Sequence, residues 1–182
     1  MCILVVVPAH AKLPSKNELL AMHRVNPHGM GFACKSMHYK GMNFERFYNR
    51  LQFVPEDEDV IIHFRFATHG SIGVKNCHPF YKGGIWFAHN GILDVTPIGD
   101  MTDSETAFRE IIYPKIQEYG IDSDEVAWTI YEIIGYSKFA ILGKDGIVRM
   151  FGNFEKYKDR YYSNLRHLSY ISPTRYRFKW AI

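Results

Sequence analysis

The chain has 182 residues, of which 47% are hydrophobic, 23% charged and 15% aromatic. This composition is typical of a folded protein with a sizeable core, and it excludes a disordered chain. The formal net charge of +3 is too small to indicate a nucleic-acid-binding protein without a clustered basic patch. We expect residues 1–182 to form a single domain.

The predicted elements follow from runs of aliphatic residues, which indicate strands, and from apolar residues at helical spacing after a capping residue, which indicate helices. In chain order they begin with a strand at 3–7, a helix at 15–25, a strand at 30–36, a helix at 43–52 and a strand at 59–67. After a turn-rich segment at 70–84 come a strand at 85–88, a helix at 102–119 that kinks or breaks at Pro114, a helix at 122–134, strands at 139–142 and 147–151, and further strands within 161–180. Strands at both ends and helices between them predict an α+β or α/β domain whose sheets are covered by helices.

The apolar run at residues 2–9 is too short to span a bilayer. It follows Met1 with no basic segment before it, which is a poor match to a signal peptide. We therefore expect a cytoplasmic protein that does not associate with membranes.

The three cysteines, Cys2, Cys34 and Cys77, are widely spaced and odd in number. This pattern predicts neither a disulfide framework nor a Cys-x-x-Cys zinc site. The nine histidines form no clear ligand cluster, and we interpret His63 and His69 as polar groups within a packed site, so no metal site is predicted.

Four short motifs carry groups suited to chemistry: Met1-Cys2, His63-Phe-Arg-Phe-Ala-Thr-His-Gly70, His89-Asn-Gly91 and Thr102-Asp-Ser-Glu105. Each motif alone is weak, because short motifs match by chance. Together with Asn76-Cys-His-Pro-Phe80, and in this order, they resemble the glutaminase domain of the class II glutamine amidotransferases, which are N-terminal-nucleophile hydrolases.

The resemblance implies the α+β class and a four-layer αββα sandwich, with two mainly antiparallel sheets between layers of helices. It implies hydrolysis of the side-chain amide of glutamine, or of another γ-glutamyl amide, through a thioester on Cys2 and without a cofactor. The chain after the glutaminase-like region is too short for a synthase domain. We therefore expect that ammonia is released or passed to a separate synthase subunit.

Cys2 is the nucleophile that the resemblance implies. Removal of Met1, which a small second residue permits, would give Cys2 a free α-amine, and an α-amine that titrates near pH 7.7–8.0 is a suitable base for the thiol. Asn90, through its side-chain N–H, and Gly91, through its backbone N–H, resemble the donors to the reaction's oxyanion. The alternative for Asn90 and Gly91 is a hairpin turn.

Arg65 and Asp103 resemble the residues that bind the two charged groups of the amino acid. Arg65 would bind the α-carboxylate through its guanidinium fork, and Asp103 would bind the α-ammonium. Thr68 and His69 would line the same pocket through backbone groups, and residues 70–84 would close over the substrate. The alternatives are a strand-surface ion pair for Arg65 and a helix N-cap for Asp103.

The sequence departs from the family pattern at two positions, because Ile3 stands where Gly is common and Phe66 stands where Trp or Tyr is common. An alternative function is a catalytically idle member that binds a ligand or a protein, although an idle copy has no need for the intact set of site residues. Basic and aromatic residues alternate in Arg175-Tyr-Arg-Phe-Lys-Trp180, a pattern that also occurs in nucleic-acid-binding segments. We favour a strand with one solvated basic face.

Overall fold

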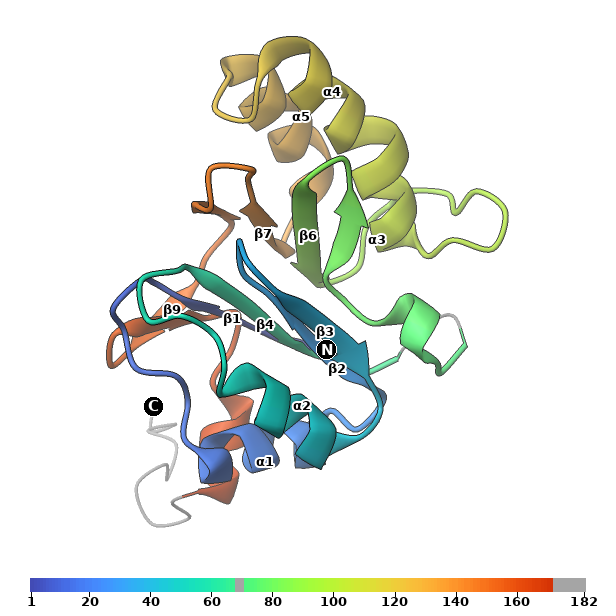
Figure 1. Ribbon diagram of the computed structural model, residues 1–182. Helices are drawn as coiled ribbons and strands as arrows, with labels where there is room; N and C mark the ends of the chain where they lie inside the picture. Colours follow the sequence, from blue (N-terminus) through green and yellow to red (C-terminus); the bar gives the residue numbers. More distant parts are fainter. Residues whose placement is uncertain (68–70, 172–182) are drawn as a thin grey trace, which may run out of the picture.

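Two antiparallel sheets lie between two layers of helices in this computed structural model, which describes residues 1–67 and 71–171 (Figure 1). The six-stranded sheet has the order β3-β2-β4-β1-β10-β9, and the four-stranded sheet has the order β5-β6-β7-β8. Helices α1 and α2 cover the outer face of the larger sheet, and α4 and α5 cover the outer face of the smaller one. The arrangement confirms the predicted α+β class and four-layer αββα sandwich.

The strands are β1 (Ile3–Val7), β2 (Met30–Ala33), β3 (His38–Gly41), β4 (Val60–Phe64), β5 (Phe80–Lys82), β6 (Ile85–Asn90), β7 (Lys138–Leu142), β8 (Val148–Phe151), β9 (Glu155–Tyr157) and β10 (Arg160–Tyr162). The helices are α1 (Lys16–Val25), α2 (Phe44–Leu51), α3 (Asp103–Thr106), α4 (Tyr113–Tyr119) and α5 (Asp124–Ile134), with 3-10 helices η1 (Val74–Asn76) and η3 (Arg166–Tyr170) and the π-helical turn η2 (Ala107–Ile112). Within the described ranges, none of these helices has the length and apolar character that a bilayer crossing requires.

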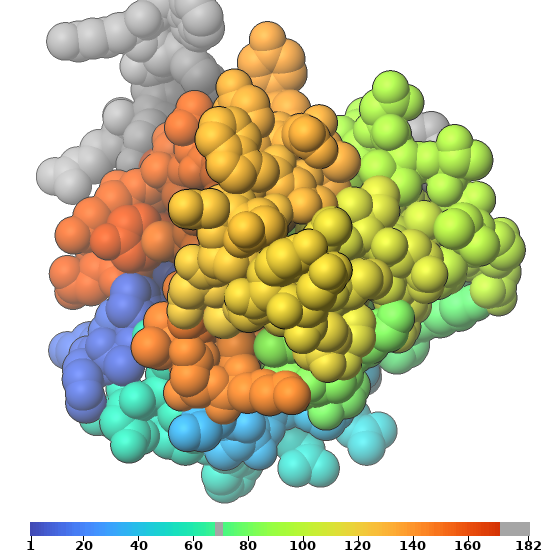
Figure 2. Space-filling model, turned by 90° about the horizontal axis from the view of Figure 1, so that it is seen from above, coloured from blue at the N-terminus to red at the C-terminus, as the bar shows by residue number. Residues whose placement is uncertain are grey.

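The core is divided by the alternation of side chains along each strand. On β1, Ile3, Val5 and Val7 pack toward α1 and α2, whereas Leu4 and Val6 pack toward the other sheet. The layer between the sheets contains several small side chains, among them Ala33, Ala88 and Ala140. A separate apolar cluster lies between the four-stranded sheet and its helices, and Figure 2 shows these helices spread over the centre of that face.

A buried ionic network joins α1 to the end of the larger sheet. The carboxylate of Glu18 accepts hydrogen bonds from the Tyr162 hydroxyl at 2.6 Å and from Nη2 of Arg160 at 3.2 Å, and Nε2 of His167 lies 3.8 Å away. Burial alone would raise the pKa of Glu18, but the contacts with His167, Tyr162 and Arg160 outweigh it and lower the pKa to about 2. Glu18 is therefore a charged anchor between α1, β10 and η3.

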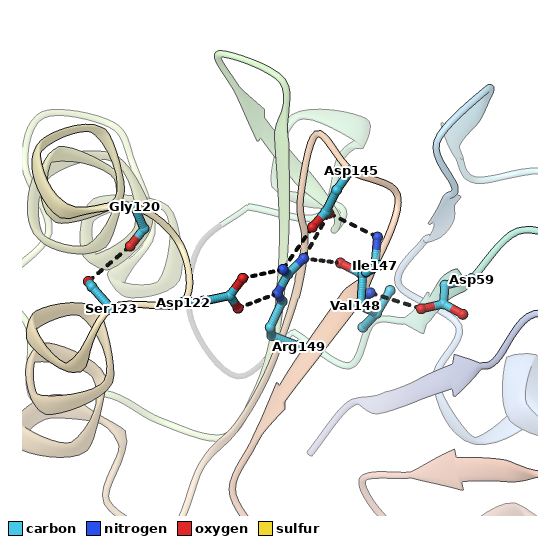
Figure 3. A network of polar contacts seen from close by, with 8 residues as sticks. All are labelled: Asp59, Gly120, Asp122, Ser123, Asp145, Ile147, Val148 and Arg149. Atoms are coloured by element: carbon cyan, nitrogen blue, oxygen red, sulfur yellow. Dashed lines mark hydrogen bonds and ion pairs between the residues drawn. The ribbon is translucent and has the colours of Figure 1, made fainter.

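A second ionic network lies at the surface and joins the α4–α5 turn to the β7–β8 hairpin (Figure 3). Arg149 binds both carboxylate oxygens of Asp122, at 2.8 and 2.5 Å, and donates to Asp145 at 2.8 Å. Beside this network, Asp59 accepts from the backbone N–H of Val148 at 2.9 Å and of Ala9 at 2.8 Å. Asp59 thus connects the two sheets through the start of β8 and the segment after β1.

Several predicted boundaries differ from the structure. Strand β6 continues through His89 to Asn90, where the prediction ended it at Ala88, because both polar residues pair with β7. The predicted break near Pro114 takes the form of the π-helical turn that precedes α4, since proline has no N–H for a regular helical bond.

The C-terminal prediction is only partly correct. The strands β9 and β10 start before residue 161, and Arg166–Tyr170 forms a 3-10 helix where strands were predicted. Residues 175–180, whose basic and aromatic pattern the sequence singled out, lie outside the described residues.

Candidate active site

A small pocket lies where one end of each sheet meets the start of α3. Its walls come from the residue before β1, from the segments after β4 and β6, from the η1–β5 connection and from the first residues of α3. Its volume is about 50 Å³, which is too small for a whole amino acid. An amino-acid substrate therefore requires the pocket to widen.

Four of the predicted site residues, Cys2, Arg65, Gly91 and Asp103, line this pocket. Asn90 lies beside it, and its side chain is directed toward Ser163. The structure thus brings together five residues that are separated by up to 101 positions in the sequence. The other two predicted residues, Thr68 and His69, lie outside the described residues.

Cys2 is held immediately before a rigid strand. Strand β1 pairs with β4 on one side and with β10 on the other, and Nδ2 of Asn164 donates to the Cys2 carbonyl at 2.8 Å. The backbone N–H of Phe66 donates to Sγ of Cys2 at 3.3 Å. Burial raises the pKa of the Cys2 thiol, and the Phe66 backbone and Arg65 only partly offset this effect. The thiol is therefore protonated at neutral pH, and its use as a nucleophile requires a base.

Asn90 is fixed by a hydroxyl group rather than by a turn. Its Nδ2 donates to Oγ of Ser163 at 2.7 Å, and the same Oγ accepts from the backbone N–H of Leu4 at 2.9 Å. Because an amide nitrogen carries two hydrogens, Asn90 retains a second donor. The hairpin alternative is wrong, since Asn90 is the last residue of β6 and pairs with Lys138.

Gly91 occupies a position that no other residue fits. Its φ is +151°, and a Cβ there would come within 2.1 Å of Oγ of Ser137. The chain therefore turns out of β6 with its backbone close to the start of β7.

Arg65 and Asp103 are both fixed by backbone contacts. Arg65 is 4% exposed and donates from Nη1 to the carbonyl of Ser71 at 2.9 Å. It follows the end of β4 and is buried, so it does not lie on the surface of a strand. The carboxylate of Asp103 accepts from the backbone N–H groups of Ser104, at 2.7 Å, and Leu93, at 3.1 Å.

The N-cap of α3 is Thr102, whose Oγ1 accepts from the backbone N–H of Glu105 at 3.2 Å. The N-cap alternative for Asp103 is therefore wrong. Asp103 is the first residue of the helix, with its carboxylate at the pocket.

The sequence prediction gave no role to three buried histidines near the pocket. The rings of His63 and His78 lie 4.4 Å apart between centroids, and Nε2 of His63 lies 3.1 Å from the carbonyl of His89. Burial lowers the pKa of His63 to about 3 and of His89 to about 4, and it lowers the pKa of His78 well below its usual value. Each histidine belongs to a motif that carried the resemblance, which was the available signal.

Within residues 1–67 and 71–171, no group of three His, Cys, Asp or Glu side chains is placed to hold a metal ion.

The segment proposed to close over the substrate is partly core. Asn76, Cys77 and His78 are buried, and residues 80–82 form β5. Closure by this segment stays a prediction, and the exposed residues before Asn76 are the part that can move without unpacking the core.

A larger groove, of about 680 Å³, opens between the β3 and β5 edges, but no predicted site residue lines it.

Comparison with known proteins gives one family match. Residues 51–147, more than half of the chain, match the family model described as glutamine amidotransferases class-II. The matched range contains Arg65, Asn90, Gly91 and Asp103, and it begins after Cys2.

A curated relative and a solved structure are also similar to the chain. A candidate glutamine amidotransferase of Haemophilus influenzae is 48% identical over 63 residues, which cover 28% of this chain and 21% of that protein. The structure of glutamine phosphoribosylpyrophosphate amidotransferase from B. subtilis, complexed with ADP and GMP, matches with a TM-score of 0.54 and 16% identity, over 89% of this chain and 41% of that one. At this identity the structural match shows the fold alone, and the chain matches less than half the length of either protein.

Proposed function

The chain belongs to the class II glutamine amidotransferases, and from this premise we propose that it hydrolyses the side-chain amide of glutamine, or of a related γ-glutamyl amide, through a thioester on Cys2. Hydrolysis of the glutamine amide with transfer of ammonia is the general activity of the family. The nucleophile, the substrate range and the fate of the ammonia are proposed for this chain. We also propose that residues 1–182 act as one glutaminase-type domain.

One observation carries the proposal. A thiol, a guanidinium, a carboxylate and a backbone N–H lie around one small pocket, on Cys2, Arg65, Asp103 and Gly91. These are the groups that the hydrolysis of an amino-acid amide needs: a nucleophile, partners for both charges of the amino acid, and a donor to the oxyanion.

The reaction begins with the α-amine of Cys2, once Met1 has been removed. Met1 is 58% exposed, so its removal does not require unfolding. The amine takes the thiol proton, and Sγ forms a bond to the amide carbon of the substrate. The carbonyl oxygen becomes an oxyanion, which the Gly91 backbone N–H and the second Nδ2 hydrogen of Asn90 stabilise.

Collapse of this intermediate breaks the carbon–nitrogen bond. The nitrogen takes the proton back from the α-ammonium and leaves as ammonia. Water then adds to the thioester and gives its proton to the same amine, which releases glutamate and restores the thiol. The ammonia either leaves the protein or passes to a separate synthase subunit.

The first test measures glutamate and ammonia released from glutamine by purified protein, together with its intact mass. We expect a mass that corresponds to Cys2 as the first residue. Cys2→Ala should abolish release, whereas Cys34→Ala, which removes a buried thiol outside the pocket, should retain it. Full activity with Met1 retained would contradict the mechanism. Absence of release from protein that begins at Cys2 would favour the idle binding module.

The second test asks whether Arg65 and Asp103 recognise the charged end of the substrate. Arg65 should pair with the α-carboxylate and Asp103 with the α-ammonium, so an analogue that lacks one charge leaves a buried partner unpaired. Such mismatches reduce kcat/KM by up to ~10⁴-fold. We expect strong losses for Nα-acetylglutamine and for glutamine α-methyl ester. Asp103→Asn should reduce the first discrimination and Arg65→Lys the second. Equal rates for free and doubly capped glutamine would assign both residues purely structural roles.

A further inference from the structure

Two buried histidines line the pocket and a third packs behind them, and the reaction above gives none of them a task. His63, His78 and His89 are 0%, 6% and 3% exposed. His78 and His89 line the pocket with Cys2, as does Asn76, and the ring of His63 packs on that of His78. We refer to these three histidines and Asn76 as the histidine wall.

The hydrogen bonds fix which nitrogen of His63 and of His89 carries the hydrogen. A carbonyl only accepts, so Nε2 of His63 donates to the carbonyl of His89 and the neutral ring has a lone pair on Nδ1. Nδ1 of His89 lies 2.7 Å from Oγ of Ser104, which lies 3.2 Å from Oδ1 of Asp103. The single hydroxyl hydrogen goes to the carboxylate, the stronger acceptor, so Nδ1 of His89 donates to Ser104. His89 therefore has a lone pair on Nε2.

The wall is rich in acceptors and poor in donors. Among the described residues, Nδ1 of His63, Nε2 of His89, both ring nitrogens of His78 and Oδ1 of Asn76 have no hydrogen-bond partner. A neutral His78 supplies one acceptor and one donor. The wall therefore contains four acceptors and one donor without partners, and all of these except Nδ1 of His63 belong to residues that line the pocket. Buried polar atoms without partners cost about 1–3 kcal/mol each, so a ligand that satisfies them stabilises the site.

We propose that the histidine wall binds the amide nitrogen of the substrate and then the ammonia that leaves. This inference rests on the proposed function. A primary amide nitrogen presents two N–H donors, and ammonia presents three donors and one acceptor, which complement the wall. An ester oxygen at the same place presents no donor. The wall thus selects substrates by their leaving group, independently of the charges that Arg65 and Asp103 recognise.

The neutrality of the histidines is consistent with this role. Burial lowers the pKa of all three, so their lone pairs stay available near pH 7. The contact chain from Asp103 through Ser104 to His89 also joins the residue proposed for the α-ammonium to the wall. Among the described residues, the wall is not part of any group of three His, Cys, Asp or Glu side chains placed to hold a metal ion.

The test compares two substrates that form the same thioester on Cys2: glutamine and glutamate γ-methyl ester. His78→Phe keeps a planar ring and removes both nitrogens. We expect it to lower kcat/KM for glutamine ~10–100-fold, the effect of about one hydrogen bond in a buried site. The same variant should change kcat/KM for the ester less than about 3-fold. The methoxy leaving group has no hydrogen to donate to His78, so the substitution removes no hydrogen bond to it. His78→Asn, which keeps an acceptor, should fall between the wild type and His78→Phe for glutamine.

His23→Phe is the matched control. His23 also has a partly buried ring with an unpartnered Nδ1, but it lies on α1 and packs on Phe44. It should leave both substrates unaffected. Thermal unfolding of each variant identifies those that fold.

The outcomes separate the two proposals. If the wild type hydrolyses both substrates and His78→Phe lowers both equally, or lowers neither, the leaving-group role is wrong while the proposed function stands. If the wild type hydrolyses neither these two substrates nor any other γ-glutamyl amide, the proposed function is wrong. A selective loss with glutamine in both His78 variants supports the histidine wall.

Discussion

The two ionic networks that fasten the outer layers differ in their exposure to solvent. In the buried network, the side chains of Glu18 and Arg160 are each 4% exposed. In the surface network, Arg149 is 16% exposed, but Asp145 is 42% and Asp122 is 67% exposed. The surface network nevertheless has the better geometry, since Arg149 binds Asp122 through two parallel bonds.

From this comparison we expect the contribution of an ion pair to stability to follow its burial more than its geometry. Hydrogen bonds from Arg149 lower the pKa of both surface carboxylates, but water and salt screen such pairs. The buried pair of Glu18 and Arg160 is different, because removal of one charge leaves the other charge buried without a partner. The buried network also leads to the active site, since β10 is followed directly by Ser163 and Asn164.

The largest effect is expected for Glu18→Gln. The change leaves Arg160 buried without an opposite charge, and such losses cost about 3–5 kcal/mol of unfolding free energy. Urea denaturation measures the loss, and activity should fall with it because Ser163 and Asn164 hold Asn90 and Cys2. The control is Glu45→Gln, which removes an exposed partner of Lys16 on α2 and should cost less than about 1 kcal/mol. Equal losses in the two variants would refute the distinction by burial.

The next prediction concerns the dependence of stability on pH, in which the buried histidines should differ from both ionic networks. The unfolded state of a histidine has a pKa of about 6.5. If the folded pKa lies far below this value, the unfolded state binds a proton first as the pH falls. The contribution of the histidine to stability is therefore lost below about pH 6.5. Burial lowers the pKa of His78 well below its usual value, so His78 contributes to this loss. Glu18 does not contribute in this range, since its pKa is about 2.

Urea unfolding of the wild type and of His78→Phe at pH 7.5 and pH 5 measures this contribution. Between the two pH values, the wild type should lose more unfolding free energy than the variant. An identical pH dependence in the two proteins would mean that His78 is protonated in the folded state.

The smallest effect is expected for Arg149→Met. The change removes every contact of the surface network but leaves only exposed or half-exposed partners, so we expect a loss of about 1 kcal/mol or less. The loss should shrink further in 0.5 M salt, and kcat/KM for glutamine should not change. A loss comparable with that of Glu18→Gln would show that bidentate geometry outweighs solvent exposure.

The sequence predicts the site better than it predicts the strands around it. Cys2, Arg65, Gly91 and Asp103 line one pocket, as predicted. They could be predicted because each belongs to a motif that carried the resemblance to the family. Strand β3 was missed, since His38–Gly41 has no alternation of apolar and polar residues and lies at a sheet edge. Pairing with β2 makes this segment a strand, and pairing is not visible in a local pattern.

The support of the site could not be predicted from local patterns either. The contact between Asn90 and Ser163 joins residues 73 positions apart and belongs to the packing of one sheet on the other. The histidine wall has the same origin, because His63 lies on β4, His89 lies on β6 and His78 precedes β5. Sequence motifs supplied these residues, but only the stacked sheets give them common neighbours.

The small side chains between the sheets have a consequence for chemistry. Cys2 and Arg65 flank strands of the larger sheet, whereas Asn90 and Gly91 belong to the end of β6 in the smaller one. The nucleophile and the oxyanion donors therefore belong to different sheets, and the layer of side chains between these sheets includes the methyl group of Ala88. Ala88 lies on the same face of β6 as Asn90. A bulky residue at position 88 would push the two sheets apart and so separate the catalytic groups without contacting any of them.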